Sequence, residues 1–310
     1  MTHGTLYLDC TVIENGHVQV ASPGAIRASY WTFNNASIQL RTWSASKIEH
    51  CEFHGGEHLG VLIEGTHSDS KPRPNRMNMA EWMSRHRHKC FTAEELYSHV
   101  VQTNTQQSFK GEDDKDVVDS HLLIKELKEK ISLTENAIVN IPKEMSVPLS
   151  QRTHLYPGSA AMNILKSSVG CIVRDCRFHS RRGAVIVRRQ GTAWLEGNDI
   201  SNVTFGIRCL ASSSVVILAN VIHDCNMSGM FFRDRATGLV AGNVIFRNGE
   251  AGVDIRTSSD PILQHNQIFN GRRSGVVVLD SGRGTLVDND IYDNREAGIY
   301  ILYRGNPIIR

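Results

Sequence analysis

A set of charged and aromatic residues recurs at intervals of 23 or 46 positions in the second half of this 310-residue chain. It comprises Arg208, Phe231, Arg233, Asp254, Arg256 and Tyr300. Arginine and large aromatic side chains are favoured anchors of protein interfaces. A lone carboxylate could also serve acid–base chemistry, but glycoside hydrolysis requires two carboxylates at a defined separation on one face. Positions 231 and 277, one interval away on either side of Asp254, hold Phe and Val. We therefore expect a binding face for a protein and no catalytic residue.

The interval is set by two ladders of residues. Six glycines lie 23 residues apart, each before a short, largely apolar run: Gly183, Gly206, Gly229, Gly252, Gly275 and Gly298. Five asparagines follow at intervals of 22, 23, 23 and 23: Asn198, Asn220, Asn243, Asn266 and Asn289. A fixed period in the twenties is typical of stacked units that cannot bury a core singly.

One repeat shows what kind of unit is stacked. Residues 239–261 contain three apolar pieces of two to four residues, separated by Asn, Gly and polar turns. No piece is long enough for a helix, and the alternation of apolar and polar residues indicates strands. The main alternative, the leucine-rich repeat, needs several leucines per unit in a fixed frame, whereas these units carry one or two. The predicted fold class is all-β, a right-handed parallel β-helix with coils of about 23 residues.

Both ladders are interpreted as scaffold. Asparagines stacked at a tight bend can hydrogen-bond to the coils above and below, and Asn tolerates a left-handed backbone. Glycine before each strand permits a backbone conformation that other residues resist. In this register Val253 points inward and Asp254 outward. Aspartate at position 253 should therefore prevent folding, whereas alanine at position 254 should not.

The glycines also define the residues on the outer face. If the first residue after each glycine points inward, the second and fourth point outward. The second residues are Val185, Arg208, Phe231, Asp254, Val277 and Tyr300, and the fourth are Val187, Leu210, Arg233, Arg256, Leu279 and Leu302. Such an apolar face often marks a partner site. The alternatives are that an insertion or a neighbouring domain covers this face, or that β-propensity alone selected these residues.

Three regions follow from the pattern. Residues 1–65 hold shorter, degenerate coils that recur every 20 to 21 residues, and residues 161–310 hold the regular repeats. Residues 66–160 break the pattern and are predicted to be a partly disordered insertion that loops from one coil. Short helices are expected at 81–87 and 93–101, and an amphipathic helix at 120–133.

Composition narrows the class of protein. The net charge of +2 favours neither nucleic-acid binding nor an acidic tail. Seven cysteines without framework spacing indicate a reducing compartment, so we expect a cytoplasmic location. Neither a signal peptide at Met1 nor a membrane-spanning apolar run is found.

Metal and cofactor chemistry has little support in the sequence. His86, His88 and Cys90 alternate within a basic stretch. Zinc takes such ligands, but a fourth ligand is not evident and the spacing is not a standard one. A solvated basic loop is the favoured interpretation. We expect no metal and no cofactor.

Several segments resemble the β-helix-containing F-box-only proteins. These are residues 12–20, 241–256, 273–279 and 294–307. Within them, Ala-Gly-Val-Asp-Ile-Arg and Ala-Gly-Ile-Tyr-Ile-Leu-Tyr recur in family order. The resemblance covers nearly all of the chain outside the insertion, which matches only in position.

The resemblance implies the substrate receptor of an SCF-type (Skp1–cullin–F-box) ubiquitin ligase. In that family an F-box binds Skp1, and the β-helix presents target proteins for ubiquitination and proteasomal degradation. No F-box precedes Thr2 and several C-terminal coils are missing. The chain is therefore expected to be a piece of a longer protein, without the Skp1–cullin link. The alternative is a carbohydrate-binding or polysaccharide-cleaving protein, because the family shares its repeat type with such proteins.

Overall fold

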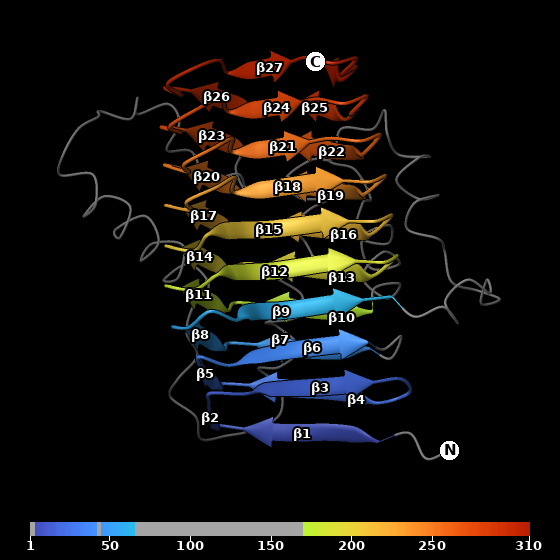
Figure 1. Ribbon diagram of the computed structural model, residues 1–310, viewed down its shortest axis with the longest axis vertical. Coiled ribbons are helices and arrows are strands. Elements are labelled where there is room, and N and C mark those ends of the chain that lie inside the picture. The colour runs from blue at the N-terminus through green and yellow to red at the C-terminus, as the bar shows by residue number, and fades with distance from the viewer. Residues whose placement is uncertain (1–3, 42–44, 66–169) are drawn as a thin grey trace, which may run out of the picture. The chain divides into compact units, whose positions relative to one another are not determined.

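The computed structural model describes residues 4–41, 45–65 and 170–310. These residues form a right-handed parallel β-helix of about nine coils, with no helix among them. Each coil contributes three short strands, and equivalent strands of successive coils pair in parallel (Figure 1). Three sheets therefore run along the solenoid, and we name them sheets A, B and C. The predicted fold class is confirmed.

Sheet A consists of ten strands. They are β1 (Thr5–Asp9), β4 (Ala25–Ser29), β7 (Ser46–Glu49), β10 (Cys171–Arg174), β13 (Thr192–Glu196), β16 (Ser214–Leu218), β19 (Thr237–Ala241), β22 (Asp260–Gln264), β25 (Thr285–Val287) and β28 (Ile308–Ile309).

Sheets B and C consist of nine strands each. Sheet B contains β2 (Val12–Glu14), β5 (Thr32–Asn34), β8 (Glu52–His54), β11 (Arg177–His179), β14 (Asp199–Ser201), β17 (Val221–His223), β20 (Val244–Phe246), β23 (Gln267–Phe269) and β26 (Asp290–Tyr292). Sheet C contains β3 (His17–Ala21), β6 (Ser37–Arg41), β9 (Leu59–Glu64), β12 (Gly183–Arg188), β15 (Phe205–Leu210), β18 (Met230–Arg233), β21 (Val253–Ile255), β24 (Val276–Val278) and β27 (Ile299–Ile301).

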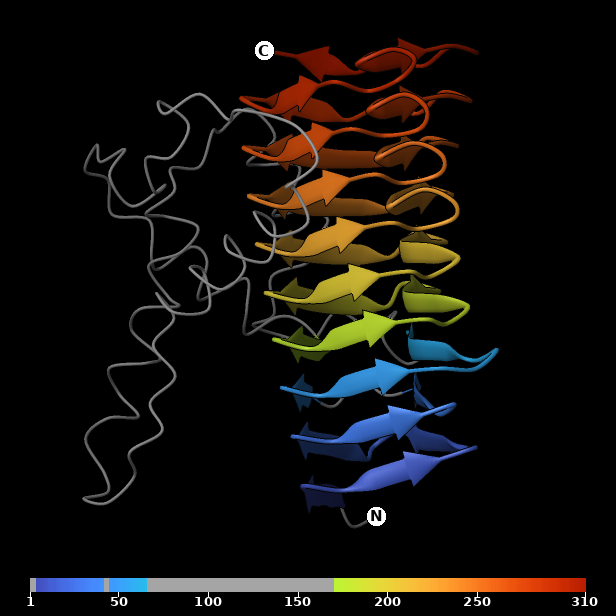
Figure 2. The same ribbon diagram turned by 90° about the vertical axis from the view of Figure 1, so that its left-hand side faces the viewer.

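The two described parts of the chain on either side of residues 66–169 form one continuous stack. Strands β7, β8 and β9 pair directly with β10, β11 and β12 (Figure 2). The pairing joins residues such as Leu62 and Ile186, which are far apart in sequence. The helices expected at 81–87, 93–101 and 120–133 lie outside the described residues, as do His86, His88 and Cys90.

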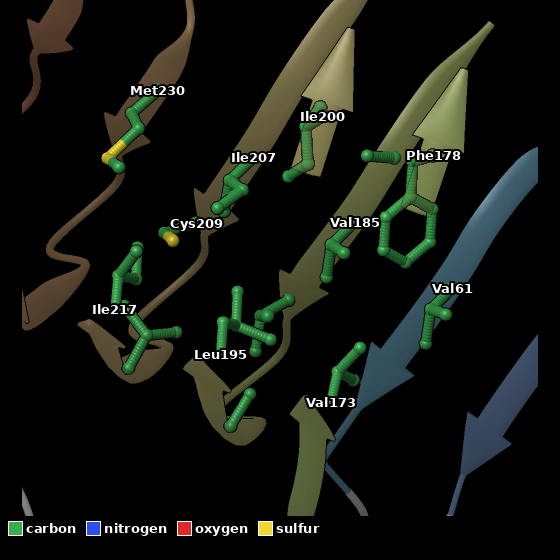
Figure 3. Close-up of a cluster of buried hydrophobic side chains, with 14 of the residues drawn as sticks. Val61, Val173, Phe178, Val185, Leu195, Ile200, Ile207, Cys209, Ile217 and Met230 are labelled. Atoms are coloured by element: carbon green, nitrogen blue, oxygen red, sulfur yellow. The ribbon is translucent and has the colours of Figure 1, made fainter. Parts of the chain in front are cut away.

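Alternate residues of most strands point into one main core along the solenoid axis. Val61, Val185, Ile207 and Met230 form one such inward file from β9 to β18 (Figure 3). Phenylalanines stack in the same way on sheet B, with ring centroids 4.4 Å apart between Phe33 and Phe53 and 4.6 Å between Phe53 and Phe178.

The register corrects one part of the expected outer face. Val185 and Val187 point inward, with 1% and 0% of their surface exposed, although their distance from Gly183 predicts the opposite. Val185 pairs with Ile207, so this coil contains 22 residues while the glycines are 23 apart. Gly183 therefore pairs with Phe205, one position away from Gly206. The glycine ladder is in register only from Gly206 onward.

The asparagine ladder forms the predicted hydrogen bonds between coils. The side-chain amide of Asn220 donates to Asn243 Oδ1 (2.9 Å), and Asn243 Oδ1 also accepts the backbone N–H of Asn220 (2.9 Å). Asn243 bonds to Asn266 in the same manner. The expected left-handed backbone lies one residue earlier, for example at Ala219 and Gly242, so the conformational tolerance of Asn is not what selects it.

The glycine ladder also has a different cause from the expected one. Gly206 and Gly229 have no left-handed backbone; the space beside them is filled instead. A Cβ atom on Gly206 would lie 2.3 Å from the carbonyl oxygen of Gly229, and one on Gly229 would lie 2.9 Å from the carbonyl oxygen of Gly252. Glycine is required because backbones of successive coils approach closely here.

Most of the described cysteines are packed thiols. None of the six forms a disulfide, and five are buried: Cys51, Cys171, Cys176, Cys209 and Cys225. Burial raises the pKa of Cys225 to about 12, which keeps this thiol protonated and unreactive. The described residues also include no helix long and apolar enough to cross a membrane.

Candidate functional site

The expected binding residues lie on the outer face of sheet C. One outward column, here called the central column, runs along the stack through the pairing of β3, β6, β9, β12, β15, β18, β21, β24 and β27. Its members are Gln19, Gln39, Leu62, Ile186, Arg208, Phe231, Asp254, Val277 and Tyr300. In parallel strands in register, side chains of one column lie one strand spacing apart, about 4.8 Å. Neighbouring members of the column are therefore in reach of each other.

Arg208 and Phe231 form the middle of this column. The guanidinium carbon of Arg208 lies 3.8 Å from the ring centroid of Phe205 and 5.9 Å from that of Phe231. Arg256 lies on the other side, 5.7 Å from the Phe231 centroid. Phe231 is thus placed between two cations, each contributing on the order of 0.5–1 kcal/mol at a partly exposed site. Arg208 Nη2 also donates to Met227 Sδ over 3.4 Å.

Asp254 forms a bidentate salt bridge with Arg256. Arg256 Nε and Nη2 donate to the two carboxylate oxygens of Asp254, each over 2.8 Å, and Asp254 is only 3% exposed. The hydrogen bond to Asp254 raises the pKa of Arg256. Since both oxygens of Asp254 accept from one guanidinium, this carboxylate holds Arg256 in place and is not free for acid–base chemistry.

The remaining two candidates are not part of this cluster. Arg233 is exposed, and its Nε lies 3.5 Å from Asp234 Oδ1. Tyr300 is 45% exposed and is separated from Asp254 by Val277 in the column. The structure therefore brings together Arg208, Phe231, Asp254 and Arg256, and leaves Arg233 and Tyr300 as separate exposed side chains on the same face.

A hollow adjoins Arg208 on the side of the earlier coils. Its volume is about 330 Å³. The residues of its walls lie on both sides of positions 66–169 in the sequence: Ser37, Gln39, Glu57, His58, Leu59, Leu62, Arg182, Ile186, Phe205 and Arg208. Sequence reasoning missed most of these residues. The Arg-Arg pair before Gly183 was a visible signal, but only the pairing of β9 with β12 shows that it faces residues 57–62.

The cationic groups at this hollow are incompletely neutralised. Burial lowers the pKa of Arg208, the carboxylate of Glu250 acts in the opposite direction, and the positive charge of Arg182 lowers it further. Arg208 Nε is buried without a hydrogen-bond partner in the described part of the chain. Neither Arg182 nor Arg208 forms an ion pair with a described carboxylate. Among the described residues that line this hollow, two arginines therefore face one carboxylate, that of Glu57.

The outer face of sheet B carries a second charged cluster, and it is neutralised. His223 Nδ1 lies 2.7 Å from Asp224 Oδ2, and His223 Nε2 lies 3.4 Å from Asp199. Arg247 donates to both oxygens of Asp224 over 2.9 and 2.7 Å. Burial opposes the charged imidazole, yet the hydrogen bonds to Asp199 and Asp224 raise the pKa of His223. The rings of His223 and Phe246 stack at 4.8 Å.

Metal ligands are not gathered anywhere in residues 4–41, 45–65 and 170–310. Within these ranges no group of three or more His, Cys, Asp or Glu side chains could hold a metal ion.

Comparison with known proteins gives two kinds of similarity. A family model described as right handed beta helix region matches residues 161–310. F-box only protein 10 of Homo sapiens is 38% identical over 94 residues, and that of Mus musculus is 39% identical over 94 residues. These residues are 30% of this chain and 10% of each relative, so the match spans about a tenth of the length of the curated relatives.

Solved structures resemble the chain in backbone only. A periplasmic alginate epimerase has a TM-score of 0.45 and 12% identity, over 96% of this chain and 62% of that chain. XylC in complex with xylose has a TM-score of 0.38 and 12% identity, over 86% of this chain and 38% of that chain. Neither similarity bears on the chemistry of the face described above.

Proposed function

From the match of residues 161–310 to a family model described as right handed beta helix region, we propose that this chain is the target-binding β-helix of an SCF-type ubiquitin-ligase receptor. The observation that carries the proposal is the similarity to F-box only protein 10 over 94 residues. The link to Skp1 and the cullin would require an F-box outside the 310 residues. The receptor itself is non-catalytic and works in the cytoplasm, where buried, unpaired thiols such as Cys176 and Cys209 stay reduced.

The mechanism is positioning. Each coil is bound to the next by backbone pairing in three sheets and by the asparagine ladder, which makes the solenoid a rigid support. A target held on a rigid support is kept near a ubiquitin-loaded enzyme, and the effective concentration of its lysines rises. In this scheme the outer face of sheet C binds the target.

The geometry of the face supports binding more than cleavage. Phe231 is half-buried between Arg208 and Arg256, which are amphipathic anchors with rotamers already restricted by packing. Asp254, the carboxylate of the central column, is engaged by Arg256 through both oxygens. A glycosidase would need two available carboxylates on one face.

The test uses the full-length protein of the native transcript, expressed in cultured cells. Two readouts are measured: co-purification of Skp1, and the set of proteins whose ubiquitinated lysines increase with the wild type. A triple variant, Phe231→Ala with Arg233→Ala and Tyr300→Ala, removes side chains that are at least partly exposed. Arg295→Ala, an exposed residue of a turn, is the control.

The wild type and the control should bind Skp1 and modify the same proteins, whereas the triple variant should bind Skp1 and lose those proteins. An unchanged set of modified proteins with the triple variant would exclude the sheet C face as the binding surface. Failure of the wild type to bind Skp1, or polysaccharide cleavage by the purified protein, would overturn the receptor function itself.

A further inference from the structure

Arg181 is a buried cation that the fold has not neutralised. It is 4% exposed, and its guanidinium donates to three backbone carbonyls: Nη2 to Ala36 (2.6 Å) and Leu59 (3.0 Å), and Nε and Nη2 to His58 (each 3.3 Å). Its Nη1 has no hydrogen-bond partner in the described part of the chain. Burial lowers the pKa of Arg181 to about 10, with no carboxylate acting against it. A buried charge without a counterion destabilises the folded state, and a bound anion that pairs with it would offset this loss.

Other partly buried arginines of the solenoid each form a salt bridge with a carboxylate. Arg256 is held by Asp254, Arg247 by Asp224, and Arg188 by Glu64 over 2.5 Å. Each of these arginines faces a carboxylate supplied by its own or an adjacent coil. The buried Arg181 and the half-buried Arg208 have no such partner among the described residues, and neither has the exposed Arg182 beside them.

These three arginines border two hollows that share Arg182 and Glu57. Arg208 lines the first, of about 330 Å³, and Arg181 lines the second, of about 490 Å³. Ser180, Thr204 and Asn226 add polar side chains to the second hollow. The two hollows thus meet at the exposed Arg182, and the buried Arg181 belongs to the wall of the second.

The first hollow also has an apolar wall. Leu62, Ile186 and Phe205 pack on one another in a small cluster on the outer face of sheet C, apart from the main core. An apolar group placed there would cover the 5 to 8% of these three side chains that still faces water. A ligand that fits both hollows therefore combines a negative charge with a neighbouring apolar group.

We propose that these hollows bind an acidic segment of a target protein. An anionic side chain of the segment, a carboxylate or a phosphorylated residue, is held at the exposed Arg182, where the two hollows meet, with Arg208 in the wall of the first hollow. An adjacent apolar side chain rests on Leu62 and Phe205. The bound anion relieves the repulsion between Arg182 and Arg208 and accepts from the exposed guanidinium of Arg182. This inference deepens the proposed function, because it names the chemistry of the target.

The test measures binding of short labelled peptides to the purified 310-residue chain by fluorescence anisotropy. Three peptides share alternating Leu and Phe residues and differ only in the polar positions, which are Glu, phosphoserine or Gln. Arg182→Gln is the main variant, because Arg182 is exposed and its loss should not affect folding. Arg295→Gln removes the same charge from an exposed turn elsewhere and is the matched control.

The Glu or phosphoserine peptide should bind at least tenfold more tightly than the Gln peptide, and binding should weaken as salt is added. Whichever anionic peptide binds more tightly identifies the source of the negative charge. Arg182→Gln and Arg208→Gln should each weaken binding about tenfold, the loss of one charge-assisted contact, whereas Arg295→Gln should not.

Equal binding of the three peptides, or equal loss with Arg182→Gln and Arg295→Gln, would overturn the proposal. Either result would leave the receptor function open, since Skp1 binding and ubiquitination are measured separately on the full-length protein. Conversely, a chain that binds acidic peptides but whose full-length form lacks Skp1 would retain this site and lose the proposed function.

Discussion

Two neighbouring parts of the outer face of sheet C use arginine in opposite ways. On β18 and β21, Asp254 supplies both oxygens to Arg256, and the pair fixes the cation beside Phe231. In the bend before β12 and on β15, Arg182 and Arg208 border a hollow and have no ion pair with a described carboxylate. A paired guanidinium already has its hydrogen bonds within the fold, whereas an unpaired one retains donors for a ligand. The same residue type is therefore structural in one coil and available for binding two coils away.

Sheet B strengthens this contrast. There Asp224 accepts from Arg247 and lies beside His223, so the charges of three side chains are largely satisfied by each other. The rings of Phe246, Phe269 and Tyr292 continue the stack above His223, with centroids 5.2 and 4.9 Å apart. This face is organised by internal contacts, which favour stability over recognition.

The largest expected effect on stability comes from placing a carboxylate in the core, one residue away from the outward Asp254. Val253 is fully buried, whereas its neighbour Asp254 points outward. Val253→Asp should destabilise the chain by roughly 4 kcal/mol or more, because an unpaired carboxylate would be buried. Urea unfolding of this variant is compared with Val277→Asp, an outward position of the same sheet. Similar losses in the two variants would refute the register on which the comparison of cations depends.

The next largest effect on stability distinguishes Arg256, which is paired with Asp254, from Arg182, which has no ion pair with a described carboxylate. Asp254→Asn should cost about 1–2 kcal/mol, because the bidentate bond is lost while Arg256, with 37% of its side chain exposed, can still reach water. Arg182→Gln should change the free energy of unfolding by less than about 0.5 kcal/mol, since no ion pair is broken. Chemical denaturation measures the free energy of unfolding of both variants. A larger loss of stability in Arg182→Gln than in Asp254→Asn would show that Arg182 is the more strongly paired of the two cations.

A smaller effect concerns pH and the neutralised cluster on sheet B. The pKa of His223 is raised in the folded chain by Asp199 and Asp224, against the effect of burial. A group with a raised folded pKa stabilises the fold fully below its unfolded pKa, about 6.5, and loses that contribution as pH rises through the folded value. The advantage of the wild type over His223→Gln in urea midpoint should therefore shrink between pH 6 and pH 8. His17→Gln, an exposed control, should show no such trend, and a growing advantage of the wild type would reverse the sign assigned to His223.

The smallest expected effect concerns Glu57, the carboxylate beside the arginines of the two hollows, and the affinity for an acidic peptide. Among the described residues that line the two hollows, Glu57 is the one carboxylate, and it is exposed. Glu57→Gln should tighten binding of the acidic peptide about twofold to threefold, because a like charge near the ligand is removed. Peptide anisotropy measures the change, and weaker binding would show that Glu57 contributes to the site instead of opposing it.

Much of the fold could be predicted from residue spacing alone. The ladders of Asn and Gly predict stacked coils because each Asn must hydrogen-bond to the next coil and each Gly must allow its backbone to approach closely. Both requirements repeat at a fixed interval, which is visible in the sequence. The outward direction of Arg208, Phe231 and Asp254 follows from the same spacing. The spacing fails at Gly183, because one coil is a residue shorter and the glycine no longer marks the same position.

The sequence by itself therefore determined the repeat, the fold class and the outer face of the regular coils, all of which depend on short periodic patterns. Only the tertiary structure decided which charges are satisfied. Asp254 could be recognised as outward, but its pairing with Arg256 depends on side-chain directions. The hollow beside Arg182 depends on β9 pairing with β12, between residues such as Leu62 and Ile186 on opposite sides of residues 66–169. Contacts across such a separation leave no local pattern, because they form only when the coils stack.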